Sequence, residues 1–152
     1  FATHGLLSGE MEGVTEPALV LTPTARGSDI DDGLLTASEI AQLKLNAELV
    51  ILSACNTAAA DGTPGAEGLL GLAKAFLYAG AQALLVSHWP VISTAATEIT
   101  TGLFREMAKH GEIGNAEALR RAMLALIKSP NKPYYSHPLF WAPYIVVGEG
   151  GP

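Results

Sequence analysis

Cysteine and charge are both scarce in this sequence. Cys55 is the one cysteine among 152 residues, so no disulfide can form within the chain, and we expect a reducing compartment such as the cytoplasm. Charged residues make up 16% of the chain and hydrophobic residues 49%, which excludes a disordered tail. The 9 basic side chains form no stripe that could neutralise phosphates, which argues against a nucleic-acid partner. We therefore expect one folded domain with a free thiol.

Long apolar runs and several common motifs are also absent. The most apolar stretch, residues 69–89, is interrupted by Lys74 and Gly80, so no membrane span is expected. The glycine-rich stretch 62–71 lacks a following Gly-Lys-Ser/Thr, and no Gly-x-Ser-x-Gly occurs, which excludes a phosphate-binding loop and a serine-hydrolase elbow. The four histidines lack the close spacing of a zinc motif, so neither a metal nor another cofactor is expected.

Short apolar runs alternate with helical patterns along the chain. Strands are predicted at 18–22, 49–53, 83–87 and 144–147, and helices at 36–43, 67–79, 93–109 and 116–127. Side-chain caps are expected from Thr36 in a capping box with Glu39, from Ser93 or Thr94, and from Asn115. This order predicts an α/β domain with a mainly parallel sheet, whose chemistry gathers at the carboxyl ends of the strands.

Two residues at predicted strand ends could perform nucleophilic catalysis. Cys55 follows the strand at 49–53, and His4 follows residues 1–3, which we expect to be the end of a strand. A cysteine peptidase needs an imidazole to protonate the departing amine, and the two residues are 51 positions apart, close to the caspase spacing. By itself the pair leaves open a core thiol and a structural histidine.

Several blocks of sequence, taken in order, narrow these alternatives. The blocks are Phe1-Ala2-Thr3-His4-Gly5, residues 33–40, Leu52-Ser53-Ala54-Cys55-Asn56-Thr57, and residues 65–69, 75–81, 85–91 and 138–144. Together they resemble the CHAT family of caspase-like domains, which are related to separase and often attached to tetratricopeptide repeats. The resemblance covers nearly the whole chain.

The resemblance implies a caspase-like three-layer sandwich and a cysteine endopeptidase that acts on a protein substrate through a thioester. It implies His4 as the proton-handling residue, Cys55 as the nucleophile, and the amides of Gly5 and Cys55 as the oxyanion hole. The family sheet has further strands ahead of the histidine, and this chain opens at Phe1 without a methionine. We therefore expect residues 1–152 to be the C-terminal, catalytic part of a CHAT domain in a larger protein, with tetratricopeptide repeats of that protein as a partner.

Residues near the strand ends are expected to line the substrate cleft: Ser53, Asp61, Glu67, Ser87 and Trp89. In separase-like relatives, acids soon after the tryptophan bind a basic substrate side chain. Here no acid follows Trp89 until Glu98, so Asp61 and Glu67 are the candidates for that charge, although a solvated loop acid and a helix-start acid are the simpler explanations of these two residues. A catalytically silent interaction or scaffold module is the alternative function.

Overall fold

The computed structural model describes residues 1–23, 32–53 and 67–149, which form two sheets and four α helices. The main sheet has the order β4-β5-β6, with β4 at Ala47–Ile51, β5 at Ala81–Ser87 and β6 at Tyr144–Gly148. The small sheet has the order β1-β2-β3, with β1 at Gly5–Leu6, β2 at Ala18–Val20 and β3 at Leu34–Thr36. The helices are α1 (Ala37–Gln42), α2 (Glu67–Tyr78), α3 (Ser93–Lys109) and α4 (Asn115–Ile127), followed by the 3-10 turns η1 (Pro133–Ser136) and η2 (Pro138–Phe140).

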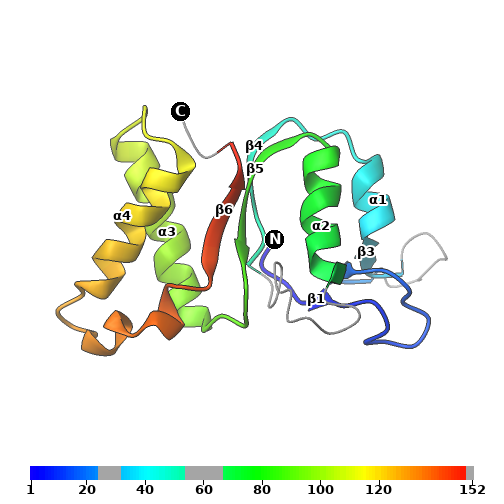
Figure 1. The fold of residues 1–152 in the computed structure, drawn as a ribbon, viewed down its shortest axis with the longest axis horizontal. Helices are drawn as coiled ribbons and strands as arrows, with labels where there is room; N and C mark the ends of the chain where they lie inside the picture. The colour runs from blue at the N-terminus through cyan, green and yellow to red at the C-terminus, as the bar shows by residue number, and fades with distance from the viewer. Residues whose placement is uncertain (24–31, 54–66, 150–152) are drawn as a thin grey trace.

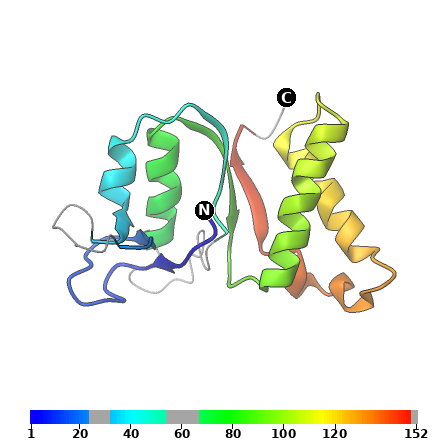
Figure 2. The ribbon, with the colours of Figure 1, turned by 180° about the vertical axis from the view of Figure 1, so that it is seen from behind.

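The main sheet lies between two pairs of helices. Helices α1 and α2 cover one face, and α3 and α4 cover the other (Figure 1; Figure 2 shows the same layers from behind). Neighbouring side chains of a strand point to opposite faces. Accordingly, Leu84 packs into the core beside α2, and Leu85 packs into the core beside α3 and α4. The predicted α/β three-layer sandwich is confirmed.

The strands of the main sheet run in two directions. β4 and β5 are parallel and are joined through α2, as the alternating pattern predicted. β6 is antiparallel to β5, because the chain returns from η2 at the carboxyl end of β5, where Tyr144 pairs with Ser87. The small sheet is antiparallel throughout. Its strands β1 and β3 were not predicted, because two or three residues are too few to show a period.

The first residues of α1, α3 and α4 show which of the predicted side-chain caps form. Thr36 and Glu39 form the predicted capping box at α1. The other two cap predictions are wrong: α3 begins at Ser93 and α4 at Asn115, and the residues before them supply no side-chain cap. The Asn115 amide instead donates to the carbonyl oxygen of Glu149, 3.4 Å away, so it ties α4 to the end of β6. Within the described residues, no helix combines the length and apolar character that crossing a membrane requires.

Candidate functional site

The first residue of the chain is bonded to the end of β4. The Phe1 amino group donates to the carbonyl oxygen of Ile51 (2.7 Å), and the Ser53 N–H donates to the carbonyl oxygen of Phe1 (2.9 Å). These two bonds have the pattern of a parallel pair in which Phe1 lies opposite Leu52. Phe1 therefore bonds to the outer edge of β4, but residues 1–3 form no strand, so the expected strand end is wrong.

This pairing places the start of the chain beside the end of β4. Phe1 and Leu52 lie opposite each other on chains that run in the same direction, and in the sequence His4 and Cys55 each follow three residues later. Cys55 itself lies outside the described residues, so the structure follows this chain only as far as Ser53.

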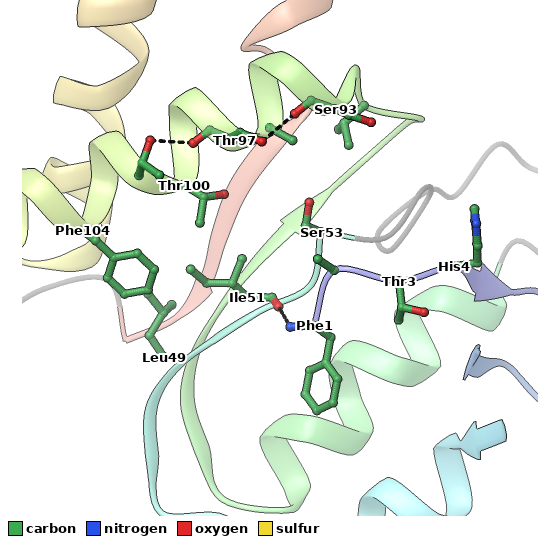
Figure 3. Close-up of a pocket in the computed structure, with 14 residues that line it drawn as sticks. Phe1, Thr3, His4, Leu49, Ile51, Ser53, Ser93, Thr97, Thr100 and Phe104 are labelled. Atoms are coloured by element: carbon green, nitrogen blue, oxygen red, sulfur yellow. Dashed lines mark hydrogen bonds between the residues drawn. The ribbon is translucent and has the colours of Figure 1, made fainter. Parts of the chain in front are cut away.

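His4 is held through its backbone. The Val20 N–H donates to the carbonyl oxygen of His4 (2.8 Å), and the Thr3 hydroxyl donates to the carbonyl oxygen of Val20. The side chains of Thr3 and His4 point to opposite sides of the chain (Figure 3). The His4 imidazole is exposed, so both solvent and a bound molecule can reach it.

Gly5 directs its amide away from the small sheet. Gly5 lies opposite Leu19, and the bond from Val20 to His4 marks this as a non-hydrogen-bonded pair of the antiparallel ladder. In such a pair, the N–H groups point away from the partner strand. β1 is the edge of the small sheet, and no other described strand pairs with that edge. The Gly5 N–H therefore points away from β2, and its expected role as an oxyanion donor stays a prediction.

Three predicted cleft residues lie at the carboxyl ends of β4 and β5. Ser53 and Ser87 each lie two residues beyond the paired positions Ile51 and Leu85, so the register places them side by side. Ser53 is partly buried, whereas Ser87 is completely buried. Trp89 is 38% exposed, and its ring stacks on the ring of His88, with the two centroids 6.5 Å apart. The exposed tryptophan thus marks the rim of this strand-end region.

The remaining predicted site residues are Cys55, Asp61 and Glu67. Glu67 begins α2, as predicted from the sequence. Asp61, like Cys55, lies outside the described residues. The roles expected of these three residues stay predictions.

A groove of about 690 Å³ lies between the first four residues, β4 and α3. Its lining comprises Phe1, Ala2, Thr3, His4, Leu49, Ile51, Ser53, Val91, Ser93, Ala96, Thr97, Thr100, Thr101 and Phe104. Figure 3 shows Thr97, Thr100 and Phe104 on α3, with Phe1 and His4 on the N-terminal segment. The described lining is mostly apolar with hydroxyl groups, and no aspartate or glutamate of the described residues belongs to it. A groove of this size and chemistry suits a neutral side chain or peptide segment.

The chemical groups at the site are those of proton transfer and hydrogen bonding. The described residues contain no cluster of three or more histidine, cysteine, aspartate or glutamate side chains that could hold a metal ion. Among them, His4 and Ser53 line the same groove, and Gly5 follows His4 directly in the chain. Together with a thiol, these groups would suffice for acyl transfer.

Sequence reasoning missed the residues that hold His4 in place. Thr3 precedes the histidine directly, and Val20 lies in a predicted strand, but nothing in their spacing indicates that they bond to each other. Only the pairing of β1 with β2 brings them together. A threonine directly before a candidate catalytic histidine was the available signal.

Comparison with known proteins agrees with this architecture. The model of the CHAT domain family matches residues 1–149. Tetratricopeptide repeat protein 28 of Mus musculus is 37% identical over 116 residues, and its Homo sapiens counterpart is 36% identical over 116 residues. Each alignment covers 76% of this chain but only 4% of the relative's length. With this match over nearly its whole length and a three-layer α/β structure, the chain belongs to the CHAT domain family, a member of the caspase-like clan.

Proposed function

We propose that this chain carries the catalytic half of a cysteine endopeptidase, with Cys55 as nucleophile and His4 as its proton-handling partner. One observation carries the proposal: Phe1 pairs with Leu52 at the end of β4, and His4 and Cys55 each follow that pair by three residues. Membership of a caspase-like family supports it, since that clan orders its histidine before its cysteine.

The proposed reaction is acyl transfer through a thioester. His4 takes the proton of the Cys55 thiol, the sulfur attacks the carbonyl carbon of the scissile peptide, and the amides of Gly5 and Cys55 hold the oxyanion that forms. When the C–N bond breaks, His4 donates a proton to the departing amine. His4 then removes a proton from water, which attacks the thioester and releases the acid and the thiol. The orientation of the Gly5 amide at the edge of β1 supports its role here.

The substrate is proposed to be a protein segment that lies across the strand ends. Ser53, Ser87 and Trp89 lie at the carboxyl ends of β4 and β5, and the described lining of the adjoining groove contains no aspartate or glutamate. Asp61 and Glu67 remain the proposed source of charge for a basic substrate side chain. Because the thiol must stay reduced, a reducing compartment such as the cytoplasm is proposed.

A scaffold function is the second candidate, and the names of the relatives favour it. Both are tetratricopeptide repeat proteins, and neither name mentions a peptidase. In that case the domain would act beside such repeats in its parent protein, and Cys55 would be a small residue without a catalytic role.

Peptide cleavage by point variants tests the proposal. A peptide library is incubated with the wild-type protein, with Cys55→Ala, with His4→Ala and with His110→Ala, and the products are identified by mass spectrometry. His110 is the matched control because it is an exposed histidine at the end of α3, outside the groove lining. We expect Cys55→Ala to abolish cleavage, His4→Ala to reduce it by roughly 100-fold or more, and His110→Ala to leave it unchanged.

Two results would contradict the peptidase. Cleavage that survives Cys55→Ala would remove the nucleophile from the mechanism. A Cys55 thiol that reacts with iodoacetamide but with no peptidyl electrophile would show an accessible cysteine without a substrate site, which favours the scaffold. Because Cys55 is the one cysteine in the chain, each labelling result reports on this residue alone.

A further inference from the structure

The segment from Phe1 to His4 passes from the main sheet to the small sheet. Phe1 is hydrogen-bonded to β4, and the centroid of its ring lies 5.3 Å from the ring centroid of Phe76 in α2. Three residues later, the carbonyl oxygen of His4 accepts from Val20 in β2. The position of His4 relative to the end of β4 therefore depends on how this short segment is fixed at its second end.

Val20 offers both of its backbone polar groups to this segment. Its N–H donates to His4, and its carbonyl oxygen accepts from the Thr3 hydroxyl. In a continued antiparallel ladder, the carbonyl oxygen of Val20 would accept the amide of His4. The Thr3 side chain thus occupies the place of the next ladder bond, at the point where the strand stops and the chain turns toward β4.

The acceptor of this hydrogen bond is firmly held. Ala18 and Leu19, which precede Val20 in β2, are completely buried. Leu21, which follows it, donates to the carbonyl oxygen of Gly33 at 2.7 Å. A hydroxyl bonded to such an anchor restricts the backbone of the residue directly before His4.

The His4 side chain has no comparable support in the described part of the chain. Its imidazole is exposed, and no described residue forms a hydrogen bond with it. In the described part of the chain, His4 is therefore held through its backbone, by the bonds of Thr3 and His4 to Val20. Catalytic rates are sensitive to such placement, since an error of about 1 Å can cost roughly 100-fold.

We propose that the Thr3 hydroxyl is a positioning group for His4. It holds the imidazole beside the end of β4, the strand that precedes Cys55 in the sequence. This inference rests on the proposed peptidase function. Thr3 acts on the histidine through the backbone, so its loss lowers kcat and leaves KM largely unchanged.

Three variants separate the hydroxyl from the volume of the side chain. Thr3→Val keeps the branched shape and removes the donor, whereas Thr3→Ser keeps the donor. Thr94→Val is the matched control, because Thr94 is an exposed threonine on α3 that does not belong to the groove lining. We expect Thr3→Val to lower kcat by roughly 10- to 100-fold with KM within about twofold. Thr3→Ser should stay within about threefold of the wild type, and Thr94→Val should not change kcat.

The rate of Cys55 alkylation at pH 6 gives a second readout. An ordinary thiol is almost fully protonated at that pH, so fast alkylation there reports a thiolate supported by the imidazole. We expect His4→Ala and Thr3→Val to lose this fast reaction and Thr3→Ser to keep it. Thermal unfolding checks that each variant is folded, and Thr3→Ala replaces Thr3→Val if the latter does not fold.

The outcomes distinguish this inference from the proposed function. If His4→Ala changes neither cleavage nor alkylation, the peptidase proposal fails, and the role of Thr3 fails with it. If His4→Ala abolishes both while Thr3→Val retains the wild-type kcat, only the positioning role is overturned. The same holds if Thr3→Ser is as impaired as Thr3→Val, because the hydroxyl would then not be the cause.

Discussion

Replacing Gly80 by alanine should destabilise the protein at the turn between α2 and β5. Gly80 has a φ of 102°, a conformation in which an alanine side chain is strained by about 1–2 kcal/mol. An added Cβ would also lie 2.4 Å from the carbonyl oxygen of Leu45, closer than atoms can approach. Leu45 is not free to move away, because its N–H donates to the carbonyl oxygen of Ala79 at 2.7 Å.

A gain from the unfolded state partly offsets the conformational cost and the cost of the clash. Relieving the clash by a backbone shift costs about 1–3 kcal/mol. Alanine restricts the unfolded chain more than glycine, which returns about 0.4–1 kcal/mol. We therefore expect Gly80→Ala to lower the free energy of unfolding by about 3 kcal/mol, which lowers Tm by roughly 6–12 °C in a chain of this length.

Two other glycines provide controls for each part of this argument. Gly9 has a φ of 81° but nothing within 4 Å of an added Cβ, so Gly9→Ala measures the conformational cost alone, about 1 kcal/mol. Gly111 has neither a positive φ nor a close neighbour, so Gly111→Ala should not lower Tm. Circular dichroism during heating measures all three variants. If Gly80→Ala melts at the same temperature as Gly9→Ala, the close approach of Leu45 to this turn is refuted.

Two further predictions concern α4 and the core. Hydrogen bonds from Arg120 and Arg121 hold the pKa of Glu117 at about 2, against an ordinary 4.5. The stabilisation by this carboxylate is therefore present above pH 4.5 and lost as the pH falls toward 2. Glu117→Gln should flatten the pH dependence of the free energy of urea unfolding across that window, and an unchanged pH dependence would contradict this assignment. Ile99 is completely buried and Phe104 is 53% exposed on the same helix, so Ile99→Ala should lower the free energy of unfolding by about 2–4 kcal/mol and Phe104→Ala by about 1 kcal/mol. Equal losses in urea unfolding would mean that the wrong face of α3 has been placed against the sheet.

Long periodic segments made most of the fold predictable. Helices α2, α3 and α4 and strand β5 carry enough apolar side chains to show a helical period or a continuous buried run, and each lies where it was predicted. The capping box at Thr36 was also predictable, because both of its bonds form within four residues. The direction of β6 was not, since only its pairing with β5 decides which way it runs.

The candidate site was predictable only as a set of strand ends. The sequence places His4, Ser53 and Trp89 after apolar runs, and the structure places each near the carboxyl end of a main-sheet strand. It does not indicate that Phe1 pairs with Leu52. That pairing depends on contacts between residues about 50 positions apart, which local patterns do not contain.

His4 and the strand leading to Cys55 therefore belong to different sheets. β4 is fixed by the main sheet, whereas the carbonyl oxygen of His4 is bonded to β2 of the small sheet. Leu19 of β2 packs in the same core as Phe76 of α2, so the small sheet is held against the main one through that helix layer. Any change that shifts β2 within this core must also shift His4 relative to the end of β4. Substitutions in the α1–α2 layer can thus alter the geometry of the proposed catalytic pair without contacting either of its members.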